Sequence, residues 1–207
     1  MKAFRQDSPF NDFMSTLGDL AVVNMIWLVC CLPIVTIGAS TSAMFDLVQG
    51  LRRQEDTHIL SRFFRAFGRR FTTSLVLTLL YLTFIGLSAF DLWYASRAME
   101  DTDLASLAYG VTLTLICLVL AGTAFVFPLA SSGGLSAWKQ VKRSARLALL
   151  HPLTALVMTA LQVLPVLVSV LIPGGLPFTV FFWSIILTSA SAWLDTVLMD
   201  RAGIGRG

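Results

Sequence analysis

The chain alternates between long stretches without any charged residue and short stretches where the charges gather. Four stretches contain no Asp, Glu, Lys or Arg, and they cover residues 20–45, 71–90, 104–138 and 147–194. An α-helix rises about 1.5 Å per residue, so about 20 apolar residues cross a bilayer core about 30 Å thick. Each stretch can therefore form a membrane-spanning helix, and the last is long enough for two.

This pattern predicts an all-α fold, a polytopic transmembrane helical bundle of about five spans with amphipathic cytoplasmic helices. The expected spans are 20–37, 72–94, 107–129, 152–171 and 177–199. The composition agrees, because 13% of the residues are charged, whereas a soluble domain has about 25%. The remaining residues are too few for a separate soluble domain, so we expect residues 1–207 to form a single integral membrane domain.

Proline and glycine divide the apolar stretches. The segment 172–177, Ile-Pro-Gly-Gly-Leu-Pro, predicts a tight reversal between the last two spans, because proline lacks a donor N–H and glycine adopts turn conformations easily. Within the spans, Pro128 and Pro165 predict kinks.

The charges between the spans predict the orientation. Segment 46–70 has six Arg against three acids, and segment 139–146 has four basic residues and no acid, whereas 91–103 has one Arg against four acids. Basic loops stay on the cytoplasmic side, so the first two segments face inward. Five spans then place the N-terminus outside.

The first apolar stretch leaves a second arrangement open. Pro33 and Gly38 could break it into a half-helix and a returning helix over 39–51. That arrangement gives four full spans plus a re-entrant segment, with both termini inside.

Residues 59–71 have the pattern of an amphipathic helix lying flat on the cytoplasmic side. Its apolar residues are Leu60, Phe63, Phe64, Phe67 and Phe71, and Arg62, Arg65 and Arg69 take the other face. One interpretation is an interfacial anchor, with aromatic side chains at the acyl boundary and arginines at anionic headgroups. The other is a docking helix for a cytoplasmic partner. Residues 138–149 repeat the amphipathic pattern.

Motifs for catalysis, nucleotide binding or metal binding are missing from the sequence. There is no phosphate-binding glycine loop and no zinc-protease motif, the two histidines lie in different segments, and the three cysteines lie inside apolar stretches. We therefore expect no enzyme, no cofactor and no metal site. Positive-inside sorting already explains the basic charge, so a nucleic-acid partner is not expected either.

Three polar residues remain within the apolar stretches. Asn24 and Gln162 favour helix-to-helix hydrogen bonds over substrate binding. Asp195 lies near the expected cytoplasmic end of the last span, where it is either an interfacial residue or part of a functional polar site.

The first span contains a specific pattern. Residues 24–45 read Asn24-x-x-Trp27-x-x-Cys-Cys-Leu-Pro33-Ile-Val-Thr36-Ile-Gly38-Ala-Ser, followed by Ala-Met-Phe. This pattern resembles the opening of the YesL family, bacterial polytopic membrane proteins of uncharacterised function, and the Arg-Phe-Phe-Arg-Ala-Phe stretch from residue 62 is similar to that family's segment before its second span. The resemblance is strong over about residues 10–75.

The resemblance implies a multi-pass protein of the bacterial cytoplasmic membrane. Members of the family tend to be encoded near carbohydrate-uptake ABC transporters, which implies an accessory role in sugar import, but the family supplies no catalytic or binding residues. The motif has two interpretations: a structural kink, in which Thr36 can satisfy a freed carbonyl, or a contact site for a partner. Its residues are Asn24, Trp27, Pro33, Thr36 and Gly38.

Two functions compete most closely. The first is a non-enzymatic accessory or assembly component that contacts the membrane or ATPase subunits of a sugar ABC transporter. The alternative is a small stand-alone transporter or channel acting as a homo-oligomer, which would need polar residues along a path, and only Asn24, Gln162 and Asp195 are available in the spans.

Overall fold

A computed structural model describes residues 9–53, 58–98, 103–132, 136–172 and 187–204, and the single positions 174, 177, 179 and 181. Within these residues every regular element is a helix, which confirms the all-α prediction. In chain order they are α1 (Pro9–Cys30), the short 3₁₀ helix η1 (Ile34–Thr36), α2 (Ile37–Arg52), α3 (Ile59–Ala98), α4 (Asp103–Thr123), α5 (Val126–Ser132), α6 (Ala137–Leu150), α7 (Pro152–Leu171) and α9 (Thr188–Arg201).

Four segments of the described chain are long and apolar enough to cross a membrane. They are Ile34–Arg52, Ile59–Arg97, Ser106–Leu129 and Pro152–Ser169. The apolar part of α1, Met14–Cys30, is somewhat shorter. The chain is thus a multi-pass integral membrane protein.

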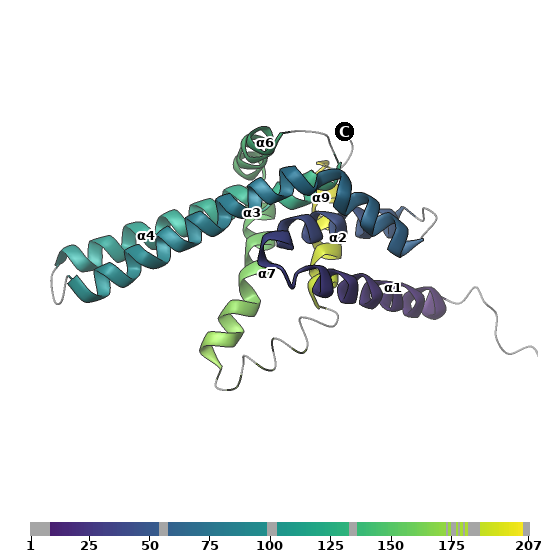
Figure 1. Ribbon diagram of the computed structural model, residues 1–207, viewed down its shortest axis with the longest axis horizontal. Helices are drawn as coiled ribbons and strands as arrows, with labels where there is room; N and C mark the ends of the chain where they lie inside the picture. Colours follow the sequence, from purple (N-terminus) through teal and green to yellow (C-terminus); the bar gives the residue numbers. More distant parts are fainter. Residues whose placement is uncertain are drawn as a thin grey trace, which may run out of the picture.

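The first apolar stretch forms two helices instead of the expected single span over 20–37. Helix α1 ends at Cys30, and Pro33 takes an extended conformation with φ −76° and ψ 117° before η1 and α2 begin. Proline cannot continue a helical hydrogen-bond ladder, so the helix stops ahead of it. The two helices run in opposite directions (Figure 1), which is the broken arrangement that Pro33 and Gly38 left open.

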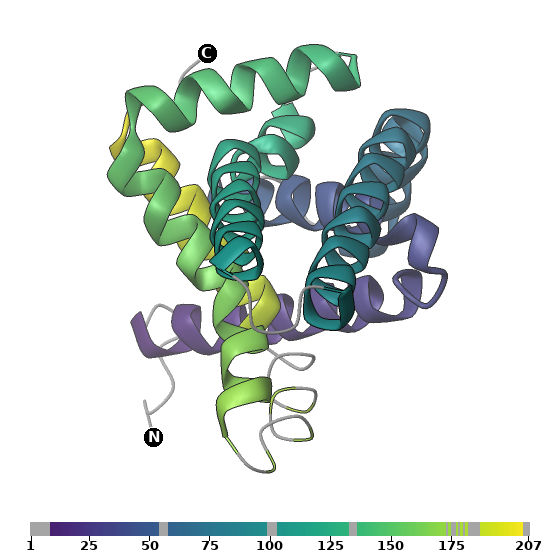
Figure 2. The ribbon, with the colours of Figure 1, turned by 90° about the vertical axis from the view of Figure 1, so that its left-hand side faces the viewer.

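Helix α3 is one continuous helix of 40 residues. It contains both the amphipathic segment 59–71 and the expected span 72–94, so the amphipathic segment is not a separate element. Figure 1 shows that the ribbon bends, with its first turns beside α2 and its long apolar part running away from them. Helix α4 returns alongside α3, and this α3–α4 hairpin extends beyond the other helices (Figures 1 and 2).

Both prolines expected to kink a span, Pro128 and Pro165, lie in the described part of the chain. The interruption between α4 and α5 covers residues 124 and 125, as Pro128 predicts, because proline cannot donate to the carbonyl four residues earlier. Ser144 of α6 fills part of the gap: its hydroxyl accepts from Phe125 N at 3.2 Å and donates to Gly122 O at 2.8 Å. Helix α7 continues through Pro165. Of the expected span 177–199, only isolated positions and α9 are described, and most of the reversal at 172–177 also lies outside the described residues.

Helix α2 occupies the centre of the bundle and contacts α1, α3, α5 and α9. One buried apolar cluster surrounds it and joins residues of those neighbours, including Val23, Leu47, Phe63 and Ala192. A second cluster links the α4–α5 junction to α7 and α9 through residues such as Phe125 and Met158. The end of α2 and the start of α3 are therefore fixed on a packed support.

Candidate functional site

The turn between α1 and α2 is held by side chains from the predicted motif. The Thr36 hydroxyl lies 2.6 Å from the Cys30 carbonyl, one of the acceptors that the end of α1 leaves free. This contact confirms that Thr36 can satisfy a freed carbonyl. Across the turn, Trp27 Nε1 donates to the Thr41 hydroxyl at 3.2 Å and ties α1 to α2.

Gly38 lies where α2 and α3 come closest. Its backbone N–H donates to Thr78 Oγ1 at 3.1 Å, and one turn later the Ser42 and Ser74 hydroxyls are 3.1 Å apart. A Cβ atom at position 38 would lie 2.2 Å from Thr78 Oγ1 and 2.8 Å from Ser74 O. Small residues and interhelical hydrogen bonds of this kind are the usual means of close helix packing in membranes.

The motif residues do not gather into one open site. Asn24 and Gly38 are buried, Trp27 and Thr36 are partly buried, and Pro33 is exposed in the turn. The contacts of Thr36, Trp27 and Gly38 are internal, which supports the interpretation as a structural kink. The exposed residues at the tip of the turn are apolar, as expected for a segment that meets lipid.

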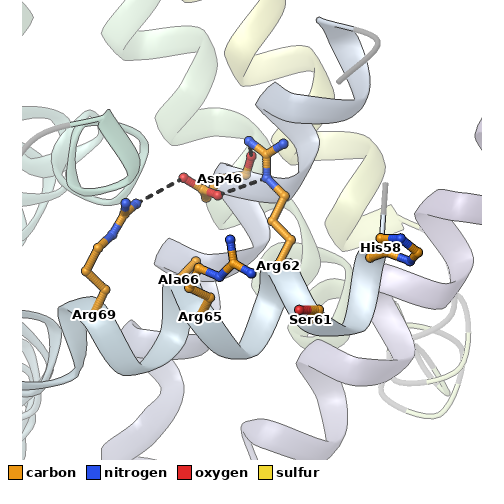
Figure 3. Close-up of a pocket in the computed structure, with 7 residues that line it drawn as sticks. All are labelled: Asp46, His58, Ser61, Arg62, Arg65, Ala66 and Arg69. Carbon is orange, nitrogen blue, oxygen red and sulfur yellow. Dashed lines mark hydrogen bonds and ion pairs between the residues drawn. The ribbon is translucent and has the colours of Figure 1, made fainter. Parts of the chain in front are cut away.

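A different site lies between α2 and the first turns of α3, at a cavity of about 340 Å³. Its lining residues are Asp46 from α2 and His58, Ser61, Arg62, Arg65, Ala66 and Arg69 from the start of α3. Figure 3 shows the three arginines on the same side of α3, facing Asp46. Arg62 Nε lies 3.2 Å from Asp46 Oδ2, and a terminal nitrogen of Arg69 lies 3.6 Å from Oδ1.

Gly50 provides the space for this arrangement. A Cβ atom at position 50 would lie 2.3 Å from the Arg62 Cζ, so the guanidinium rests directly against the backbone of α2. A second guanidinium contact, 3.4 Å to the backbone oxygen of Asp46, fixes its position further. Arg62 is thus held in place, whereas Arg65 and Arg69 are exposed to solvent.

The structure divides the apolar face of residues 59–71 into two parts. Phe63 is fully buried and stacks on the partly buried Phe67, and both pack into the cluster around α2. Leu60, Phe64 and Phe71 point outward, and Phe64 is 55% exposed. The sequence could not separate these two groups, since both fall within one apolar face of an ideal helix.

Gln162 and Asp195, the two polar candidates within later spans, lie in different environments. Gln162 is exposed on α7, whereas Asp195 on α9 is only 2% exposed. They do not form one buried polar pair. Among the described residues, no group of three His, Cys, Asp or Glu side chains could hold a metal ion.

Sequence reasoning missed the roles of Asp46 and Gly50. Asp46 is a lone carboxylate directly after the charge-free stretch 20–45, and the arginine cluster follows it closely in the chain. A single acid at the edge of an apolar helix beside several arginines was the available signal. Which arginine it pairs with depends on the α2–α3 packing, which the sequence pattern does not give.

One of the comparisons with known proteins finds a match, and it covers one segment of the chain. Residues 20–92 match the family described as "Protein of unknown function, DUF624". No curated protein and no solved structure matches the chain. The matched segment begins within α1 and continues through α2 into α3, so it contains the turn motif and the arginine-lined cavity.

Proposed function

We propose that the protein is a non-enzymatic component of the bacterial cytoplasmic membrane that assists or assembles with carbohydrate ABC-type uptake. The family match at 20–92 overlaps the part of the chain that resembles the YesL family, about residues 10–75, and that resemblance implies the link to sugar import. The packed contacts around α2 support a role in assembly. The role proposed is binding and assembly.

The observation that carries this proposal is the α3–α4 hairpin. At its base the hairpin contacts other helices, α3 with α2 and α4 with α6 and α7, and farther out many apolar side chains on both arms are exposed. The arms are joined by a hydrogen bond from the Thr112 hydroxyl to the Asp91 carboxylate. A paired, laterally exposed hairpin is a suitable surface for helices of another membrane protein, because membrane helices associate through close packing and hydrogen bonds.

Gly86 leaves open space on this surface. It is exposed on α3, and no atom lies within 4 Å of the position that its Cβ would take. A partner helix can therefore approach the α3 backbone there. Replacing Gly86 with Leu fills that space without meeting any atom of this chain.

The test is co-purification of the tagged full chain from native membranes in mild detergent, with mass spectrometry of the bound proteins. We expect permease or ATPase subunits of a sugar transporter with the parent and with Gly18→Leu, and their loss with Gly86→Leu. Gly18 is the matched control, because it is exposed on α1 and also has open space around it. Absence of transporter subunits from the parent preparation would refute the proposal.

A second candidate function is a small stand-alone transporter acting as a homo-oligomer. It is favoured by Asp195, because ionisable residues buried within a membrane bundle commonly mark ion or substrate pathways. Its distinguishing result in the same experiment is a homo-oligomer without other subunits, together with solute uptake by reconstituted vesicles that Asp195→Asn abolishes.

A further inference from the structure

The cavity between α2 and α3 contains more positive than negative charge. Three arginine side chains line it, and Asp46 is the one carboxylate among its lining residues. Asp46 forms its closer ion pair with Arg62, while Arg69 is 58% exposed and lies at the longer distance. Arg65 takes part in no ion pair within the described part of the chain and is exposed. Arg65 and Arg69 are therefore the two exposed arginines of the cavity, and Arg69 also holds the longer ion pair to Asp46.

The surroundings of these arginines indicate what kind of anion reaches them. The start of α3 has three adjoining stripes. Phe63, Ala66 and Phe67 pack toward α2, Ser61, Arg65 and Arg69 face the cavity at four-residue spacing, and Leu60, Phe64 and Phe71 form the outward apolar stripe. Apolar side chains and arginines thus lie next to each other on the exposed surface. This arrangement is typical of helices at the boundary between acyl chains and headgroups.

We propose that the cavity binds the phosphate of an anionic phospholipid headgroup in the cytoplasmic leaflet. Arg65 and Arg69 contact the phosphate oxygens, the Ser61 hydroxyl and His58 supply further donors, and the acyl chains lie along the outward apolar stripe. Asp46 and Gly50 position Arg62, which sets the inner wall of the site. The inference does not depend on the transporter partner.

The size of the cavity fits a headgroup better than a larger ligand. About 340 Å³ lies near the lower limit of the roughly 300–1,000 Å³ of small-molecule pockets. The basic segment also faces the leaflet that carries anionic lipids, according to the positive-inside rule. Charge, location and the neighbouring apolar stripe together favour a lipid as the source of the phosphate.

The experiment titrates the purified full chain in detergent with short-chain phosphatidylglycerol and, separately, with phosphatidylcholine, and measures binding by native mass spectrometry. Each arginine near an anionic surface contributes about 1 kcal/mol. We therefore expect Arg65→Gln to weaken phosphatidylglycerol binding about fivefold, and Arg65→Gln with Arg69→Gln to weaken it about thirtyfold. Phosphatidylcholine, with no net charge, should bind at least about tenfold more weakly to the parent.

The matched control is Arg143→Gln with Arg146→Gln, which removes two exposed arginines from α6 on the same predicted side of the membrane. It should leave phosphatidylglycerol binding within about twofold of the parent, because these side chains lie outside the cavity. Arg65→Gln keeps the test valid if the double variant unfolds, since Arg65 has no ion pair to lose among the described residues.

Four outcomes would overturn the inference. Equal binding of both lipids by the parent would show that charge does not select the ligand, and equal loss in the α6 control would show a general effect of charge. Displacement of phosphatidylglycerol by inorganic phosphate supports recognition of the phosphate, whereas inorganic phosphate binding without any lipid binding would make the source a soluble compound. Unchanged lipid binding in the Arg65 and Arg69 variants, with loss of a protein partner, would make this surface a protein-docking site.

Discussion

Gly38→Ala is the sharpest test of the contact between α2 and α3. The added methyl would lie 2.2 Å from Thr78 Oγ1, 2.8 Å from the Ser74 backbone oxygen and 3.1 Å from Phe127 Cε1. The Thr78 side chain can rotate away, but then its hydrogen bond with Gly38 N is lost, and the Ser74 backbone can yield only if the helices separate. Overpacking of this kind costs about 1–3 kcal/mol, and an interhelical hydrogen bond in a membrane bundle contributes about 0.6 kcal/mol. We therefore expect the free energy of unfolding to fall by about 1.5 to 3.5 kcal/mol.

The measurement is SDS-induced unfolding of the purified protein in mild detergent, followed by circular dichroism. Gly86→Ala is the control, because it makes the same change in a helix where nothing lies within 4 Å of the new atom; it should leave the stability unchanged or raise it by up to about 1 kcal/mol. The double variant Gly38→Ala with Thr78→Ala removes the nearest obstacle and should recover part of the loss. A decrease below about 0.5 kcal/mol for Gly38→Ala, the usual range of neutral surface changes, would show that α2 and α3 are not in close contact at this position.

Three further predictions follow from exposure and orientation. Phe63→Ala should lower the free energy of unfolding by about 3 kcal/mol because it empties a buried site. Phe64→Ala should change it little, because the Phe64 side chain is exposed. Equal effects of the two substitutions in SDS unfolding would contradict the division of the aromatic face. In a background without native cysteines, Ser96→Cys should react with an impermeant thiol reagent added outside intact cells, whereas Ser15→Cys should react only after the cells are opened. The reason is that separate helices α1 and α2 place the N-terminus on the side of the basic segments. External labelling of Ser15→Cys alone would reverse this topology. Pro33→Leu should lower the free energy of unfolding by about 0.4–1 kcal/mol, since Pro33 has an ordinary φ of −76° and chiefly restricts the unfolded chain. A loss as large as that of Gly38→Ala, measured in the same SDS unfolding, would show that the proline has a further role.

The sequence identifies helices well in this protein because its strongest signals are local. Charge-free stretches located the apolar helices, and Pro128 indicated the interruption between α4 and α5, since both effects act within a few residues along the chain. The first stretch was ambiguous for a physical reason. A length of 26 residues suits one tilted span or two shorter helices, and the conformation at Pro33 alone does not decide whether α2 finds enough packing to turn back.

The candidate site was only partly predictable because its contacts join separate helices. Arg62, Arg65 and Arg69 were recognised from their spacing, but their carboxylate partner lies on α2, and the ion pairs exist only because Gly50 lets the Arg62 guanidinium approach. The burial of Phe63 and the exposure of Phe64 likewise depend on the position of α2. Neighbouring residues on an amphipathic face have nearly the same sequence signal, and tertiary packing then buries one and exposes the other.

The central place of α2 also affects the order in which the protein can be completed during synthesis. Its neighbours include α9, which begins at Thr188, far beyond the end of α2 at Arg52. At translation rates of about 5–20 residues per second, the ribosome needs on the order of ten seconds to make the intervening chain. Until α9 is made, the part of α2 that contacts it has no permanent neighbour and depends on temporary shielding by lipid or by the insertion machinery. Chains interrupted before α9 should therefore be inserted but remain substrates for membrane proteases. The packing of α9 against α2 is thus the step that completes the bundle.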